Sequence, residues 1–158
     1  YKTHYRQTTL DHFAYSGTTR TYRQRVLVSD AYVAAEDPPV FLYAGNEGDI
    51  SLFYRNSGFM FTSAADFGAL LAFPESRYYG ESVPDEYFAY LSADQVLADY
   101  AELLVELRSE GGFQGVRSSG PVIVWGGSLA GMYAAWMRQA YPELVAGAIA
   151  ASAALPFL

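Results

Sequence analysis

The sequence predicts a single α/β domain in which crossover helices join the strands of a mostly parallel β-sheet. One observation is that short, fully apolar runs alternate with segments of helical periodicity, the order expected of parallel strands and their connecting helices. The other is an abrupt strand-to-turn-to-helix transition at residues 121–132. With 158 residues, 51% of them hydrophobic, the chain is long enough for one sizeable core.

Three strands are expected in the first half of the chain. Residues 21–28 alternate polar and apolar side chains, as a strand with one solvent-exposed face does. Residues 40–43 and 69–74 are short apolar runs, typical of strands that are buried on both faces. Residues 1–13 alternate poorly, and the pattern assigns them no element. The aromatic-rich residues 57–68 indicate helix in part.

Two helices and two strands are expected in the second half. The first helix begins at Ser92, which precedes apolar residues spaced along one face, and ends at Gly111. A buried strand over residues 121–125 leads into the second helix, which ends near Pro142. The small residues 145–154 predict a final strand, with an alanine-rich helix as the alternative.

Ser128 stands at the turn between the strand 121–125 and the helix that follows it. Small residues surround it, namely Gly126, Gly127, Ala130 and Gly131, and this is the pattern of a nucleophile elbow. Such a turn strains the backbone of its central residue, so bulky neighbours would not fit. Taken alone, the motif also fits a serine that caps the N-terminus of a helix.

A glycine-punctuated loop, residues 44–49, follows the strand 40–43. Gly45 and Gly48 flank Asn46 and Glu47, and this arrangement lets the backbone turn its amides toward a ligand. An ordinary turn is the alternative interpretation of the loop.

Charge and composition exclude several classes of function. The formal net charge of −7 argues against nucleic acid and anionic membrane as partners, because both favour a basic surface. The absence of cysteine excludes thiol catalysis and Cys-based metal sites, and we predict no metal and no cofactor. No apolar stretch is long enough to span a membrane. Because the chain starts at Tyr1 without signal-like regions, we expect any targeting segment to lie outside it.

Six stretches, in the same order, resemble the lysosomal Pro-X carboxypeptidase and dipeptidyl peptidase II family of serine peptidases. They are residues 9–13 (TLDHF), 41–49 (FLYAGNEGD), 56–60 (NSGFM), 75–82 (ESRYYGES), 97–101 (LADYA) and 126–136 (GGSLAGMYAAW). Together they extend over nearly the whole chain and are far more specific than a single G-x-S-x-G motif. The resemblance implies an α/β-hydrolase fold and cleavage of peptides next to proline.

The resemblance also assigns roles to residues. It implies that Ser128 is the nucleophile of a serine exopeptidase that works through an acyl-enzyme, and that the Leu129 N–H is the first oxyanion donor. The loop Gly45–Gly48 would supply the second donor, with Asn46 and Glu47 lining the substrate side. The same resemblance implies a peptide substrate with proline beside the scissile bond. It implies a lysosomal, vacuolar or secreted location, and it allows a homodimer.

The chain departs from the family pattern in its motifs and in its extent. Leu129 and Ala130 replace the usual Tyr and Gly, and Ser76 replaces a histidine. In α/β hydrolases the triad order is Ser, Asp, His, yet no histidine follows His12 in this chain. We therefore expect residues 1–158 to be the N-terminal part of the peptidase domain, incomplete in its sheet. The helical insertion, the catalytic acid and the base would lie beyond it, and the segment alone would be inactive.

The other polar residues are expected to be structural. His4 and His12 precede the first predicted strand and are interpreted as structural or surface residues, and Asp99, Glu102 and Glu106 as a solvated helix face. For the stretch from Arg77 to Glu81, a role in the pocket and a role in packing remain equally open.

Two other functions stay open from the sequence alone. One is a non-catalytic fragment or pseudoenzyme that uses the hydrolase scaffold. The other is a different α/β hydrolase such as an esterase, against which the Asn46-Glu47 loop and the 75–82 stretch count. The choice between carboxypeptidase and dipeptidyl peptidase action depends on groups that bind the free end of the substrate, and the sequence leaves it undecided.

Overall fold

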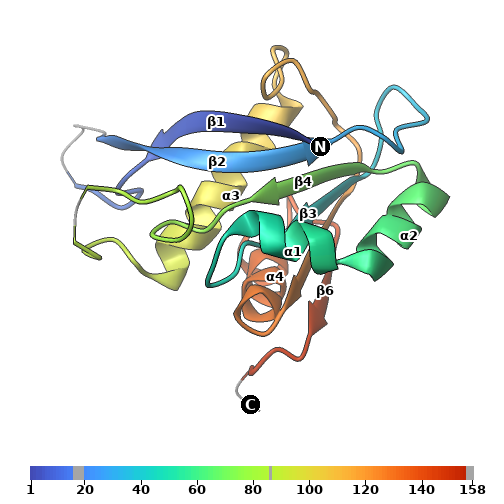
Figure 1. Cartoon of the computed structure of the whole chain (residues 1–158). Helices are drawn as coiled ribbons and strands as arrows, with labels where there is room; N and C mark the ends of the chain where they lie inside the picture. Colours follow the sequence, from blue (N-terminus) through green and yellow to red (C-terminus); the bar gives the residue numbers. More distant parts are fainter. Residues whose placement is uncertain (16–19, 86, 156–158) are drawn as a thin grey trace.

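The computed structural model describes residues 1–15, 20–85 and 87–155, and its centre is a six-stranded sheet (Figure 1). The strand order is β1-β2-β4-β3-β5-β6. The strands are β1 Lys2–Thr9, β2 Thr21–Ser29, β3 Val40–Tyr43, β4 Leu70–Pro74, β5 Val122–Gly127 and β6 Gly147–Ala151. Strand β3 pairs in parallel with β4 and β5, and β5 pairs in parallel with β6. The β1–β2 and β2–β4 pairs are antiparallel. The sheet is therefore mostly parallel, as the sequence predicts.

In the described part of the chain, four helices lie on the two faces of this sheet (Figure 1). They are α1 Ile50–Asn56, α2 Gly58–Phe67, α3 Ala93–Arg108 and α4 Leu129–Ala140. Alternate side chains of one strand enter different cores, since Leu42 packs with α3 and α4 whereas Phe41 packs with α1 and α2. Strands that are buried on both faces carry unbroken apolar runs, and this explains why β3, β4 and β5 are recognisable in the sequence.

The helix predicted from Ser92 is confirmed as α3. The Ser92 side chain accepts a hydrogen bond from the Gln95 backbone N–H and so caps the helix. The small residues near the C-terminus form strand β6 and not the alternative helix.

Two elements are absent from the sequence prediction, β1 and α1. Strand β1 pairs with β2 along its whole length, from Lys2 opposite Val28 to Thr9 opposite Thr21. Its buried positions include the polar residues Arg6 and Thr8. The sequence of β1 therefore lacks the alternation of apolar and polar residues by which a strand is recognised.

The expectation of a solvated face at Asp99 is wrong. Asp99 is fully buried on α3 and forms a bidentate ion pair with Arg77, at 2.6 Å from Nη2 to Oδ1 and 2.8 Å from Nε to Oδ2. The Tyr22 hydroxyl donates to Oδ2 at 2.8 Å, and Nε2 of His12 lies 2.8 Å from Oδ1. Burial, and then the charge of Asp99, raise the pKa of Tyr22 well above its ordinary value, so its hydroxyl stays a donor. A buried carboxylate is tolerated here because four polar bonds satisfy it.

The same cluster joins distant parts of the chain. Beyond Asp99, the Arg77 guanidinium donates to the backbone carbonyls of Thr9, Leu10 and Tyr90 at 2.8–3.1 Å. Arg77 therefore packs the end of β1 against α3, and His12 belongs to this structural cluster as expected. Glu102 and Glu106 are only partly solvated, because both pair with Arg6, at 2.9 and 3.0 Å.

Replacing Arg77 by methionine leaves Asp99 buried without its countercharge. Since breaking a buried ion pair costs about 3–5 kcal/mol, we expect Arg77→Met to lower the free energy of unfolding by that order. Chemical denaturation of the purified protein measures it. The matched control is Arg117→Met, which removes an exposed arginine 3.8 Å from Asp37 and should change little. Equal stability of the two variants would contradict the structural role of Arg77.

Candidate active site

Ser128 lies between the end of β5 and the start of α4 in a backbone conformation that serine rarely adopts. Its φ is 57° and its ψ is −125°. Such a conformation costs about 1–3 kcal/mol and persists only where the surroundings hold it. Here the Ser128 N–H donates to the Ala151 carbonyl at 3.0 Å, and its own carbonyl accepts from the Met132 N–H at 3.1 Å. The side chain is exposed at the C-terminal edge of the sheet.

Two of the surrounding glycines are required by close backbone contacts. A Cβ on Gly126 would lie 2.1 Å from the Ala130 carbonyl oxygen, and one on Gly131 would lie 2.8 Å from the Ala151 carbonyl oxygen. Gly127 differs, because the nearest atom to its added Cβ would be 3.9 Å away. The elbow therefore requires glycine at positions 126 and 131, whereas position 127 has room for a Cβ.

The alternative of a simple capping serine does not describe this turn. Ser128 occupies the N-cap position of α4, but its side chain makes no capping hydrogen bond. The first N–H groups of a helix have no partner within the helix, so those of Leu129 and its neighbours are free to bind an anion beside Ser128. Leu129, the predicted first oxyanion donor, is the first residue of this helix.

The loop Gly45–Gly48 lies next to the elbow, because β3 and β5 are parallel neighbours that end at the same edge. The Asn46 side-chain amide donates to the Gly127 carbonyl at 2.9 Å, one residue before Ser128. The Asn46 side-chain oxygen accepts from the Glu47 N–H at 3.1 Å, and Gly48 N–H donates to the Asn46 carbonyl at 2.9 Å. Glu47 is exposed. Of the predicted site residues, the structure brings Asn46 directly onto the elbow.

Gly45 allows the loop to approach β4 closely. A Cβ at this position would lie 2.6 Å from both the Pro74 carbonyl oxygen and the Ser76 backbone nitrogen. Any larger residue would push the loop away from the sheet.

Glu75 binds the end of the same loop through the Ile50 N–H. The sequence prediction does not identify this role of Glu75. Its buried carboxylate pairs with Arg25 and accepts hydrogen bonds from the backbone N–H of Ile50 at 3.0 Å and of Glu81 at 2.8 Å. Ile50 begins α1 immediately after the loop, so Glu75 connects the loop to the 75–82 turn. Gly80, at a φ of 54°, leaves room for the carboxylate. The only sequence signal is a glutamate directly after an apolar strand.

Two of the residues in the 75–82 stretch whose roles the sequence leaves open, Arg77 and Glu81, contact structural partners. Arg77 binds Asp99, as described above, and Glu81 binds Arg25 and the Tyr5 hydroxyl, both at 2.6 Å. These contacts favour packing over a role in the pocket.

Tyr133 on α4 is a buried tyrosine close to the site. Burial, and then the charges of Tyr79 and Glu47, raise its pKa to about 12. Its hydroxyl is therefore neutral over the physiological range.

No histidine accompanies Ser128 among the residues that the structure describes. His12 contacts Asp99, and His4 packs edge-on against Phe113 with ring centroids 5.5 Å apart. In the same part of the chain, no group of three or more His, Asp or Glu side chains is arranged to hold a metal ion. None of the helices described there has the length and apolar character needed to cross a membrane.

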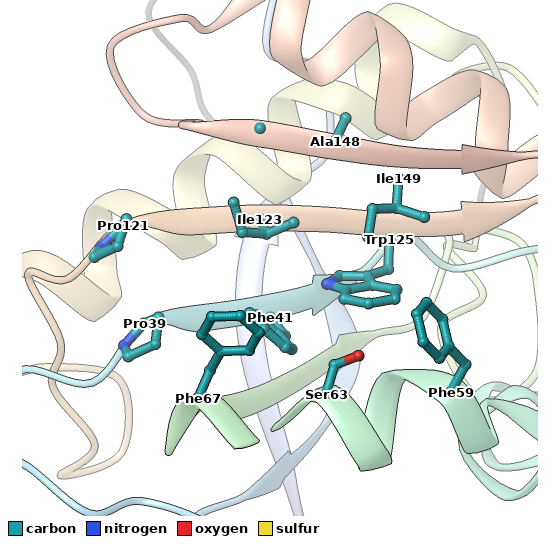
Figure 2. Close-up of a pocket in the computed structure, with 11 residues that line it drawn as sticks. Pro39, Phe41, Phe59, Ser63, Phe67, Pro121, Ile123, Trp125, Ala148 and Ile149 are labelled. Carbon is teal, nitrogen blue, oxygen red and sulfur yellow. The ribbon is translucent and has the colours of Figure 1, made fainter. Parts of the chain in front are cut away.

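An apolar groove of about 610 Å³ lies between α2 and the sheet, with Phe59, Ser63 and Phe67 of α2 facing the strands (Figure 2). Phe41, Phe59, Phe67, Ile123 and Trp125 form most of its wall, and Ser128 is not part of it. A smaller pocket of about 200 Å³ between Phe59 and Trp125 extends to Gly126 and Gly127. The large groove thus lies between α2 and the strands β3, β5 and β6, and Ser128 does not line it.

The chain matches known proteins in sequence. The profile of the family described as serine carboxypeptidase S28 matches residues 8–158. The lysosomal Pro-X carboxypeptidase of Homo sapiens is 43% identical over 161 residues, which cover 97% of this chain and 32% of that protein. A putative serine protease of Caenorhabditis elegans, pcp-1, is 40% identical and matches 98% of this chain and 29% of its own length. The chain thus spans about a third of the length of the curated relatives it matches.

The fold also matches solved structures. An α/β hydrolase from Penicillium sp. sh18 superposes with a TM-score of 0.63 at 14% sequence identity, covering 97% of this chain and 46% of that one. This similarity confirms the prediction that the chain has part of an α/β-hydrolase fold.

The contact at Gly126 gives a test of the elbow geometry. Because an added Cβ would overlap a backbone carbonyl that cannot move freely, we expect Gly126→Ala to destabilise the protein by about 1–3 kcal/mol. Gly127→Ala is the matched control, since its Cβ meets only ordinary contacts, and its stability should stay within about 1 kcal/mol of the wild type. Denaturant unfolding of both variants measures the difference. Equal stabilities would show that the tight turn is not as described.

Proposed function

The chain belongs to the serine carboxypeptidase S28 family, and on this premise we propose that it provides the nucleophile and the oxyanion site of a serine exopeptidase. The observation that carries the proposal is the strained, exposed Ser128 at the N-terminus of α4, with Asn46 bonded to the adjacent Gly127. The proposed substrate is a peptide with proline beside the scissile bond. This preference is supported by the name of the human relative, a Pro-X carboxypeptidase.

In the proposed reaction, the Ser128 hydroxyl oxygen attacks the carbonyl carbon of the scissile bond and gives its proton to a base. The carbonyl oxygen becomes an oxyanion and accepts hydrogen bonds from the Leu129 N–H and from the Asn46 loop. The tetrahedral intermediate collapses to an acyl-enzyme when the base passes the proton to the leaving amine. Water then attacks the ester, and the carboxylate product leaves with Ser128 restored. Residues 1–158 thus supply the nucleophile and the groups that bind the oxyanion, whereas the base and the acid would be supplied by residues outside this segment.

We also propose that residues 1–158 are the N-terminal part of the peptidase domain. The support is that the match includes 97% of this chain but only 32% of the length of the human relative. A helical insertion and the residues that complete the triad would belong to the remaining part. A lysosomal location is proposed from the same human relative, whose name includes it.

Labelling with a fluorophosphonate probe tests whether Ser128 is an activated nucleophile. In the full-length protein we expect one adduct, which peptide mapping places on Ser128, and we expect Ser128→Ala to abolish it. Ser119→Ala is the matched control, because it removes another exposed serine hydroxyl without altering the elbow. No adduct on the full-length wild type, or an adduct that survives Ser128→Ala, would refute the peptidase assignment and favour a non-catalytic protein.

The cleavage mode is tested with two peptides. One ends in proline followed by a single C-terminal residue, and the other begins with a dipeptide whose second residue is proline. Release of the C-terminal residue identifies a carboxypeptidase, and release of the dipeptide identifies a dipeptidyl peptidase. If an ester substrate is hydrolysed while both peptides stay intact, the protein is an esterase and not an exopeptidase.

A further inference from the structure

Two buried hydroxyl groups converge on the carbonyl oxygen of Gly45. The Ser76 hydroxyl donates to this oxygen at 2.8 Å, and the Tyr100 hydroxyl lies 3.3 Å from it. The two hydroxyls are also 2.7 Å from each other. Ser76 and Tyr100 are 1% and 0% exposed, so neither can reach a substrate. This hydroxyl clamp therefore acts on the backbone of the loop.

The clamp fixes the orientation of the peptide bond between Gly45 and Asn46. No cis peptide occurs in the described part of the chain, and in a trans peptide the carbonyl and the next N–H point in opposite directions. Ser76 follows β4 on one side of β3, whereas Ser128 follows β5 on the other side. A carbonyl held toward Ser76 thus directs the Asn46 N–H to the side of the elbow.

The Asn46 N–H is free to act there. Within the described ranges it donates to no other group, while the Asn46 side chain is fixed by its bond to the Gly127 carbonyl at 2.9 Å. The peptide bond before Asn46 and the Asn46 side chain are therefore both fixed, and the Asn46 backbone N–H faces Ser128 without a hydrogen-bond partner in the described part of the chain.

We infer that Ser76 and Tyr100 are positioning residues that hold the Asn46 N–H as the second oxyanion donor beside Leu129. The inference rests on the proposed function, because an oxyanion donor has a role only if Ser128 performs acyl transfer. A donor contributes most when it is oriented before the reaction and does not have to rotate into place.

The chemistry of the two hydroxyls fits this role. Burial raises the pKa of Tyr100 well above its ordinary value, so the tyrosine remains a hydrogen-bond donor. Tyr100 donating to Ser76, and Ser76 donating to Gly45, satisfies three buried polar groups at once. Ser76 is also a position at which this chain departs from the motif that it resembles, so the clamp is a property of this sequence.

The test measures peptide hydrolysis by the full-length protein and its Ser76→Ala, Tyr100→Phe and double variants. Loss of one oriented donor lowers kcat by about 10²–10³-fold, and we expect the double variant to approach a loss of about 10²-fold with KM nearly unchanged. The single variants should lose less, since one hydroxyl still binds Gly45. Ser76→Thr, which keeps the hydroxyl, should restore most of kcat.

The matched control is Ser118→Ala. Ser118 is another buried serine whose hydroxyl donates to a backbone carbonyl, that of Pro38, but it lies at the opposite end of the parallel strands. If the double variant keeps the kcat of this control while the wild type cleaves peptide, the positioning role is wrong and the peptidase assignment stands. If the wild type neither binds the fluorophosphonate probe nor cleaves peptide, the peptidase assignment fails, and the inference fails with it.

Discussion

The close packing of β5, α4 and β6 holds Ser128 at a positive φ, and the arrangement of the site depends on this contact. Gly126 and Gly131 let the first turn of α4 lie directly on the ends of the strands, where a single Cβ would overlap a carbonyl oxygen. The bond from the Ser128 N–H to Ala151 adds β6 to the same contact. The strained backbone raises the hydroxyl above the sheet and points the helix N-terminus at the same space. The proposed nucleophile, Ser128, and the proposed first oxyanion donor, Leu129, are thus positioned by one stretch of backbone.

Two buried carboxylates hold distant segments of the chain together. Glu75 joins the end of the Asn46 loop to the 75–82 turn through backbone amides and pairs with Arg25. Asp99, on α3, binds β2 directly through Tyr22 and reaches the end of β1 through Arg77. Burying such charges is expensive, so each is matched by a guanidinium and several hydrogen bonds. The Glu75 cluster holds the end of the loop after β3 against the turn that follows β4. Rigid support of this kind is what an oxyanion site requires, because its donors must be oriented before charge develops.

The apolar strands, the capped helix α3 and the elbow could be predicted from the sequence, because each has a local pattern. Ser128 and the Asn46 loop were recognised from such patterns, and Leu129 was implied by the family resemblance. The structure places all three at one edge of the sheet. Strand β1 was missed because Arg6 and Thr8 occupy its buried positions. Asp99 was assigned to a solvated face, and Glu75 was not identified, because a buried carboxylate cannot be told from an exposed one until its partner is known. Those partners, Arg77 and Arg25, lie 22 and 50 residues away in the chain.

The central claim is that Ser128 attacks the carbonyl carbon of the substrate while the backbone N–H groups of Leu129 and Asn46 bind the carbonyl oxygen. A crystal structure of the full-length protein after reaction with a peptidyl phosphonate measures this most directly. The account predicts a bond from phosphorus to the Ser128 oxygen, with one phosphonyl oxygen about 2.7–3.1 Å from the backbone nitrogens of both Leu129 and Asn46. A phosphonyl oxygen turned away from these two nitrogens, or an adduct on another residue, would contradict it.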